Sequence, residues 1–419
     1  MPFHVRLSPF VTAALGITLV SLATAAHNNW PCYRGPTGLG EYAGEMATQW
    51  CDDDVTWRTD LGGRGHSSPC IWGERIYITA AIKTDDNEVE RSVIAVDRND
   101  GKIAWRQVAS VGGAESVHGM NSFATSTCAT DGKHVVAYFG RGGLHCFDTE
   151  GKSLWSLDLG EFPGPWGTAA SPIILGEVVI QNCDAAGKSS LIAFHLDSGK
   201  VAWKTERADK PRGGWNTPIL INAGERNELI VNGEFGVKGY DPATGRELWF
   251  CRGFIGRGTP IPAVGNGLLV VLNGKPGDVY AVQPGGEGDV TETRMEWHTP
   301  RRGGRDCGSP IMVENRVIVA NMTGICTCYQ ATTGKELWQA RLGGNFTGSP
   351  VICQGLVYIQ NEAGETIVIK PDDKLNVVAR NEIEVAEGEL FRSSLAPSDG
   401  QIFMRSTTTL YCVGKRNPQ

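Results

Sequence analysis

Five arginines recur in glycine-rich loops, each of which precedes a short apolar segment of the chain. They are Arg64, Arg212, Arg257, Arg305 and Arg392. Polar and aromatic residues stand in the same loops, namely His66, His118, Asn121, Trp166, Trp215 and Phe346. Guanidinium groups bind carboxylates and phosphates and stack on planar rings, so such a set suits an anionic or planar ligand. The structural alternative is a solvated rim in which the arginines bridge neighbouring loops by hydrogen bonds.

Catalytic groups are sparse by comparison. Asp184, Glu234, Asp306 and Glu389 belong to or follow similar loops, but sequence spacing pairs none of them. The sequence contains no nucleophile elbow, no paired-histidine motif and no phosphate-binding loop. Cys326 and Cys328 share one face of a predicted strand, yet no second cluster stands at metal-ligand spacing. We therefore predict no catalytic residue and no metal site.

The segments around these loops are repeats, marked by a recurring Gly-Lys-x-x-Trp pattern. Its copies are Gly101–Trp105, Gly151–Trp155, Gly199–Trp203, Gly245–Trp249 (with Arg for Lys) and Gly334–Trp338. Trp57 and Trp297 fill the same position without the glycine. Successive tryptophans are 48, 50, 48, 46, 48 and 41 residues apart, which indicates one structural unit per interval.

A second landmark, a small residue followed by proline, opens most units. It occurs at Ser68, Ser171, Thr217, Thr259, Ser309 and Ser349. Between the landmarks, alternating β-branched residues and frequent turns predict four short antiparallel strands per unit. A single four-stranded sheet cannot bury both faces, whereas a ring of such sheets can, so we predict an all-β propeller. The repeated tryptophans are expected to pack between neighbouring blades, as structural residues: Trp57, Trp105, Trp155, Trp203, Trp249, Trp297 and Trp338.

The count of units predicts eight blades, with seven as the alternative if a degenerate unit is miscounted. The last unit has strands predicted at Leu390–Pro397, Gln401–Met404 and Thr409–Val413, and it lacks an outer strand. The surplus strand Asp54–Asp60 near the start is expected to complete it and so to close the ring. In this fold the arginine-bearing loops gather at one mouth of the central channel.

The cysteines that align between repeats, which include Cys70 and Cys128, are expected to be free and buried. Cys32 and Cys51 lie outside the repeats, and one disulfide between them stays possible. Cys146, Cys328 and Cys412 align with a position that holds Ala or Gly in other units, such as Ala95 and Gly239. A small buried residue is required there, and cysteine serves as a small hydrophobe. No pairing can be read from the sequence for the 12 cysteines as a set.

The start of the chain is typical of a secretory signal peptide over residues 1–26. Arg6 precedes an uncharged stretch, and Ala23 and Ala25 provide small residues for cleavage after Ala25 or Ala26. An uncleaved anchor is the weaker alternative, because polar residues interrupt the apolar run. The expected organisation is a signal peptide (1–26), a lead-in segment (27–49), the propeller (50–414) and a tail (415–419). We expect a secreted or periplasmic protein with no further membrane span.

Net charge argues against nucleic acid as a partner. The chain carries a formal charge of −7 and has no basic stretch long enough to follow a phosphate backbone. The first cysteine, Cys32, follows Asn29-Trp30-Pro31, which is not a lipidation signal. The partners left open are a protein, a glycan or a small anionic ligand, and the oligomeric state is not predicted.

The segment Ala95–Trp105 resembles the docking motif of PQQ-like propeller repeats, Ala-x-Asp-x-x-x-Gly-Lys-x-x-Trp. The likeness covers about residues 50–414, and Trp30–Pro36 resembles the lead-in of secreted bacterial propellers of this family. One branch of the family, the quinoprotein dehydrogenases, binds pyrroloquinoline quinone and calcium over the channel. Another, the propeller lipoprotein of the outer-membrane assembly machinery, is a scaffold without catalysis.

The sequence departs from both branches. It lacks the adjacent cysteine pair of the dehydrogenases and the lipidated cysteine of the assembly factor. The repeat itself indicates a fold rather than a function. We therefore expect a non-catalytic binding scaffold that uses the channel mouth and no cofactor, with a dehydrogenase dependent on pyrroloquinoline quinone and calcium as the alternative.

Overall fold

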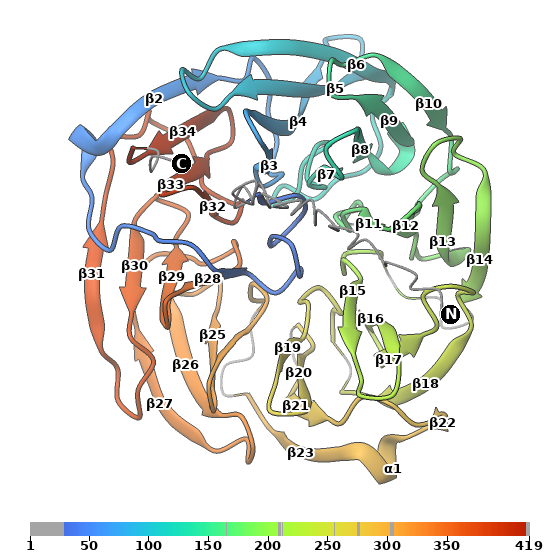
Figure 1. Cartoon of the computed structure of the whole chain (residues 1–419), viewed down its shortest axis with the longest axis vertical. Helices are drawn as coiled ribbons and strands as arrows, with labels where there is room; N and C mark the ends of the chain where they lie inside the picture. Colours follow the sequence, from blue (N-terminus) through green and yellow to red (C-terminus); the bar gives the residue numbers. More distant parts are fainter. Residues whose placement is uncertain are drawn as a thin grey trace, which may run out of the picture.

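The computed structural model describes residues 29–415, except 165, 208–210, 212, 255, 275–276 and 302–305. The expected signal peptide and residues 416–419 of the tail lie outside the described residues. Eight sheets surround a central axis, each with its first strand nearest the axis (Figure 1). The prediction of an eight-bladed all-β propeller is confirmed, and the seven-blade alternative is wrong.

The first four blades follow one another along the chain, and their strands are given from the axis outward. Blade 1 contains β3 (Cys70–Trp72), β4 (Arg75–Lys83), β5 (Glu88–Asp97) and β6 (Ile103–Gly113). Blade 2 contains β7 (Ala129–Thr130), β8 (His134–Tyr138), β9 (Leu144–Asp148) and β10 (Ser153–Leu157). Blade 3 contains β11 (Ile173–Leu175), β12 (Val178–Asn182), β13 (Ser189–His195) and β14 (Val201–Arg207). Blade 4 contains β15 (Ile219–Asn222), β16 (Asn227–Gly233), β17 (Gly236–Tyr240) and β18 (Glu247–Arg252).

The remaining blades complete the circle. Blade 5 contains β19 (Ala263–Gly265), β20 (Leu268–Leu272), β21 (Val279–Val282) and β23 (Met295–Thr299). Blade 6 contains β24 (Ile311–Val313), β25 (Arg316–Ala320), β26 (Ile325–Gln330) and β27 (Glu336–Arg341). Blade 7 contains β28 (Val351–Cys353), β29 (Leu356–Gln360), β30 (Thr366–Ile369) and β31 (Val377–Asn381). Blade 8 contains β32 (Ala396–Ser398), β33 (Gln401–Arg405), β34 (Thr409–Val413) and, as its outer strand, β2 (Val55–Asp60).

Several short elements lie outside the four-stranded blades. The strand β1 (Glu41–Tyr42) pairs with β28 on the channel side of blade 7, and β22 (Gly288–Asp289) pairs with β18 at the outer edge of blade 4. The helix α1 (Thr291–Arg294) follows β22, and single 3₁₀ turns lie at Asp52–Asp54 and Gly140–Gly142. Within the described ranges, no helix has the length and apolar character needed to cross a membrane.

Both ends of the chain contribute to blade 8, as predicted. Strand β2 pairs antiparallel with β34, with Thr59 opposite Leu410, so the ring is closed by backbone hydrogen bonds. The innermost strand of this blade begins at Ala396, not at Leu390 as the sequence indicated. Residues before Ala396 form a loop at the channel mouth, where the N–H groups of Leu390 and Ser394 donate to side-chain hydroxyls instead of to a neighbouring strand.

The repeated tryptophans lie at the junctions between blades. Six of the seven donate Nε1–H to a backbone carbonyl of the next blade, over 2.7–3.1 Å: Trp57, Trp105, Trp155, Trp203, Trp297 and Trp338. Trp249 is fully buried and donates to the carboxylate of Glu228. For the other six tryptophans, the indole donates to the turn before the outer strand of the next blade. In blade 5 that turn is replaced by an insertion that contains β22 and α1.

A small residue faces each tryptophan on the neighbouring strand. Ala95 is paired with Trp105, Gly239 with Trp249 and Cys146 with Trp155. Cys328 and Cys412 occupy the same register, and all three of these cysteines are fully buried. All 12 cysteines are free thiols in the structure, including Cys32 and Cys51, for which a disulfide was the open alternative. The slot accepts Ala, Gly or Cys because the indole covers it.

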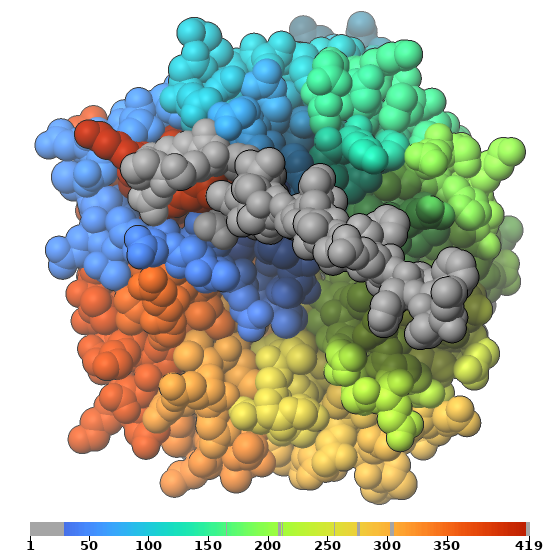
Figure 2. All heavy atoms as spheres, in the orientation of Figure 1, coloured from blue at the N-terminus to red at the C-terminus, as the bar shows by residue number. Residues whose placement is uncertain are grey.

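The lead-in segment closes one end of the channel. Trp30 forms a β-bridge with Ile71 of the innermost strand of blade 1, and β1 continues the segment across to blade 7. Figure 1 shows this blue segment crossing near the centre of the ring before it reaches β2 at the perimeter, and Figure 2 shows its atoms on the same face, beside the orange atoms of blades 6 and 7. Trp30, Tyr42, Met46 and Trp50 are buried in one core cluster with blades 7 and 8.

Candidate functional site at the channel mouth

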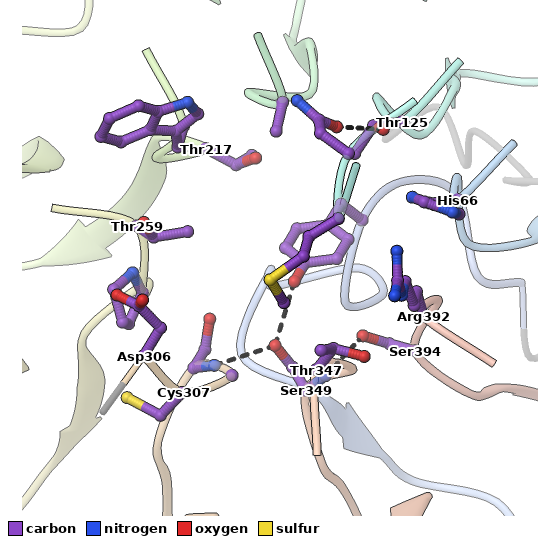
Figure 3. Close-up of a pocket in the computed structure, with 18 of the residues that line it drawn as sticks. His66, Thr125, Thr217, Thr259, Asp306, Cys307, Thr347, Ser349, Arg392 and Ser394 are labelled. Atoms are coloured by element: carbon purple, nitrogen blue, oxygen red, sulfur yellow. Dashed lines mark hydrogen bonds between the residues drawn. The ribbon is translucent and has the colours of Figure 1, made fainter. Parts of the chain in front are cut away.

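A cavity of about 230 Å³ lies on the propeller axis, and all eight blades contribute to its wall. The loops that precede the innermost strands supply its aromatic and charged residues. Tyr33 of the lead-in segment lines it from the closed end of the channel. Figure 3 shows the labelled residues arranged around this axial pocket, with His66, Arg392 and Ser394 on one side and Thr217, Thr259 and Asp306 on the other.

Hydroxyl groups immediately before the innermost strands connect successive blades. We call seven of them the hydroxyl ring: Ser68, Thr127, Ser171, Thr217, Ser309, Ser349 and Ser394. Each accepts a hydrogen bond of 2.8–3.0 Å from a backbone N–H of the preceding blade. All seven line the axial pocket, together with Thr259. The landmark identified in the sequence as a small residue is therefore a hydrogen-bonding residue.

Trp166 contacts side chains from two other loops of the mouth. The ring of His118 lies 3.9 Å from the indole, centroid to centroid, and the guanidinium carbon of Arg257 lies 4.2 Å from the ring centroid. The Asn121 amide donates to the Trp166 carbonyl over 2.7 Å and to the Thr168 carbonyl over 3.1 Å. These contacts hold the Trp166 loop against loops from two other blades.

Trp215 is fixed to the same loop. Its Nε1–H donates to the carbonyl of Gly167 over 2.8 Å. Both indoles line the axial pocket and are half-buried. Aromatic rings that are held by hydrogen bonds before a ligand arrives lose little conformational freedom on binding.

Two of the predicted arginines line the pocket and bridge loops at the same time. Arg257 forms an ion pair with Asp306 of the next blade. Arg392 pairs with Glu362 over 2.9 Å and donates to the Gly119 carbonyl over 3.0 Å. The positive charge of each guanidinium group is therefore partly neutralised by a carboxylate. This arrangement is compatible with both predicted alternatives, a ligand-binding site and a rim in which arginines bridge neighbouring loops.

His66 faces the pocket in a cationic surrounding. Burial lowers its pKa to about 3, and the charges of Arg405, Arg392 and Arg64 act in the same direction. Arg64 itself is exposed at the rim and does not line the pocket. Arg405 is fully buried behind the mouth loop, where its Nη1 donates to the Ser67 carbonyl over 3.1 Å. His66 is therefore neutral at physiological pH.

Other predicted residues lie elsewhere. Arg212 and Arg305 fall outside the described residues. Phe346 is fully buried in the core between blades 6 and 7, so its prediction as a mouth residue is wrong. Asp184 is buried in an ion pair with Arg207, and Glu389 accepts hydrogen bonds from Ser406 and Thr408. Of these carboxylates, Asp306 lines the pocket.

Several lining residues had no individual signal in the sequence. Tyr33 reaches the pocket from the lead-in segment, and Met120 and Met322 add flexible apolar surface. The hydroxyl ring did have a signal, since a Ser or Thr stands at the same place in every unit. Its occupants include Thr127 and Ser394, which lack the following proline.

In the ranges that the structure describes, no three His, Cys, Asp or Glu side chains lie close enough together to hold a metal ion. Cys307 is the one thiol among the described lining residues, and burial raises its pKa.

Comparison with known proteins points to one family. A profile described as outer membrane protein assembly factor BamB matches residues 45–127, 90–252 and 275–378. No curated protein sequence matches the chain significantly.

Among solved structures, BamB from Moraxella catarrhalis is similar at 14% identity, with 86% of this chain and 99% of that chain covered and a TM-score of 0.60. A europium-containing methanol dehydrogenase is similar at 12% identity, with 90% and 89% covered and a TM-score of 0.67. The computationally designed Ika8 protein is similar at 12% identity, with 85% and 98% covered and a TM-score of 0.59. Identities this low show the shared propeller fold alone.

Proposed function

Since the chain belongs to the PQQ-like β-propeller family described as outer membrane protein assembly factor BamB, we propose that it is a secreted, non-catalytic scaffold that binds a small planar ligand with an anionic group. The ligand lies in the axial pocket. The observation that carries this proposal is the pair of fixed indoles, Trp166 and Trp215, beside the guanidinium group of Arg257 in one concave site.

The composition of the pocket supports a ligand of this kind. Its lining combines indole and methionine side chains with hydroxyl groups and two guanidinium groups. Apolar walls with a few placed polar groups are typical of small-molecule sites. The cavity of about 230 Å³ is small for a protein segment but sufficient for a compact ring system. A protein or glycan partner would have to contact the outer rim instead.

Titration calorimetry with two matched probes tests this function. The first is 1,3,5-benzenetricarboxylate, which is planar and anionic, and the second is its neutral trimethyl ester. We expect the wild-type protein to bind the tricarboxylate more tightly than the ester, and we expect Trp166→Ala to weaken both. Leu154→Ala is the control, because Leu154 is an exposed apolar residue on an outer strand. Failure of both probes to bind, or equal binding by Trp166→Ala, contradicts the proposal.

The dehydrogenase alternative has its own test. The protein is incubated with pyrroloquinoline quinone, with and without calcium, and assayed for dye-coupled alcohol oxidation. We expect no turnover. Retained quinone with calcium-dependent turnover would replace the scaffold proposal with an enzymatic one. Amino-terminal sequencing of the exported protein tests the proposed secretion, with Ala26 or His27 expected as the first residue.

A further inference from the structure

We infer that the hydroxyl ring, together with the neighbouring hydroxyls of Thr347 and Thr259, binds an oxyanion at the floor of the axial pocket through O–H donors. This inference rests on the proposed function, because the oxyanion is the anionic group of the ligand proposed for that pocket. The ring lies deeper than the mouth loops, since its residues directly precede the innermost strands. Tyr33 contacts it from the closed end, where its hydroxyl lies 3.0 Å from Ser349 Oγ.

The ring hydroxyls have hydrogens to donate. Each hydroxyl offers one donor and two acceptor positions, and in each ring member one acceptor position is used by a backbone N–H. Apart from the Ser349–Tyr33 contact, no acceptor for these O–H groups occurs among the described residues. Hydroxyl hydrogens that face the pocket and are not used inside the protein are free to donate to a bound molecule, so the ring favours a ligand that accepts hydrogen bonds.

Two threonines next to the ring show the same preference. Thr347 Oγ1 lines the pocket, is buried and has no hydrogen-bond partner within the described part of the chain. Thr259 also lines the pocket; unlike Thr347 Oγ1 it is exposed, and its hydroxyl makes no hydrogen bond to any described residue. Figure 3 shows Thr347 on the side of the pocket where Ser349 lies, and Thr259 on the side where Asp306 lies. Neither hydroxyl is used to join blades, so neither is explained by the fold.

On the His66 side of the pocket the charge favours an anion, although Arg392 is paired with Glu362 there, and Asp306 on the opposite side is paired with Arg257. The charged groups that act on His66 at the pocket wall are Arg405, Arg392 and Arg64, and all three are cations. Arg405 carries its charge directly behind the wall and leaves Nε and Nη2 without hydrogen-bond partners among the described residues. Hydrogen bonds from neutral hydroxyls to an ionised acceptor are stronger than those to a neutral one. A carboxylate, phosphate or sulfate group satisfies the hydroxyl donors and this positive potential together.

Isothermal titration at low ionic strength, with phosphate, sulfate and acetate as separate probes and chloride as the counter-ion, tests the inference. The variants are Thr347→Val and Thr259→Val, which preserve side-chain shape and remove hydroxyls that make no internal bond. Loss of a hydrogen bond to a charged group predicts about tenfold weaker oxyanion binding. Thr347→Ser and Thr259→Ser restore the hydroxyl and are expected to restore affinity. Thr332→Val is the control, because Thr332 is exposed in the turn after β26.

The outcomes separate this inference from the proposed function. If the valine variants bind phosphate, sulfate and acetate as tightly as wild type, the ring inference is wrong, while loss of benzenetricarboxylate binding in Trp166→Ala keeps the proposed function. If wild type binds none of the three oxyanions but binds the neutral ester, the ring inference is again wrong. If no probe binds at all, both proposals fall. A crystal structure grown in sulfate that shows only waters at the ring also overturns the inference.

Discussion

The backbone N–H of Ser394 donates a hydrogen bond of 2.9 Å to Oγ of Ser68, 326 residues earlier in the chain. This contact joins blade 8 to blade 1 near the axis, while the β2–β34 pairing completes blade 8 at the perimeter. The first and last parts of the propeller are therefore joined by hydrogen bonds at two places, one near the axis and one at the perimeter. Such closure removes the free sheet edges that would otherwise open the propeller.

Removal of the Ser68 hydroxyl tests how much the hydrogen bond between Ser394 and Ser68 contributes to the stability of the propeller. Ser68→Ala is expected to lower the free energy of unfolding by about 1–2 kcal/mol, because the buried N–H of Ser394 loses its acceptor. Ser68→Thr keeps a hydroxyl at this position and is expected to lose less. Urea denaturation at constant pH measures both. An unchanged midpoint for Ser68→Ala would mean that the ring bond contributes nothing to closure.

The motif glycines pack directly on the tryptophan of the preceding blade. Gly101 has φ +73°, and a Cβ placed on it would lie 2.7 Å from the Trp57 ring. Gly101→Ala therefore combines a strained backbone with a clash, and we expect a loss of about 2–3 kcal/mol in unfolding free energy. Gly73 is the matched control, since it has φ +54° and nothing within 4 Å of its added Cβ. Equal losses for Gly73→Ala and Gly101→Ala would contradict the packing role of this glycine.

The lowered pKa of His66 predicts a pH dependence of stability. In the folded protein this pKa is about 3, below its ordinary value of 6.5. Between these values the unfolded chain binds a proton that the folded chain does not, so stability falls as the pH drops from about 6.5 toward 3. His66→Gln is expected to flatten this dependence, whereas His195→Gln, at an exposed position, serves as the control. Unfolding free energies of wild type and His66→Gln, measured from pH 7 to pH 4, test this prediction. Parallel curves for the two proteins would show that His66 does not cause the pH dependence.

Asn121 is expected to act on binding through Trp166. Its amide makes two hydrogen bonds to the Trp166 loop, at the carbonyls of Trp166 and Thr168. Asn121→Ala is expected to weaken tricarboxylate binding severalfold and to speed hydrogen exchange at Gly167 and Thr168, because the loop loses its anchor. Global stability should change by no more than about 1 kcal/mol. Unchanged exchange in this loop would show that Trp166 is held by other contacts.

The fold could be predicted from sequence because each propeller unit carries local marks. The Gly-Lys-x-x-Trp pattern and the hydroxyl-proline landmark recur at nearly constant intervals, and seven of the eight blades have the same pairing register around a tryptophan. The start of β32 was misplaced because apolar residues after Glu389 continue into a loop whose N–H groups are satisfied by side chains of distant residues.

The site was only partly predictable, because its key contacts join residues far apart in the chain. The loops that carry Arg257 and Arg392 could be assigned to the mouth, but their partners Asp306 and Glu362 depend on which loops become neighbours. Phe346 shares its loop with Thr347, yet it points into the core. Tyr33 reaches the pocket only because the lead-in segment crosses the channel, and no local pattern predicts that path.

The most direct test of the account is a crystal structure of the wild-type protein grown with 1,3,5-benzenetricarboxylate. We predict density for the ligand on the propeller axis, with its ring beside Trp166 and one carboxylate within hydrogen-bonding distance of the ring hydroxyls near Ser349 and Thr347. Density for the ligand only outside the channel, or an axial pocket filled by water alone at saturating ligand, would contradict the account.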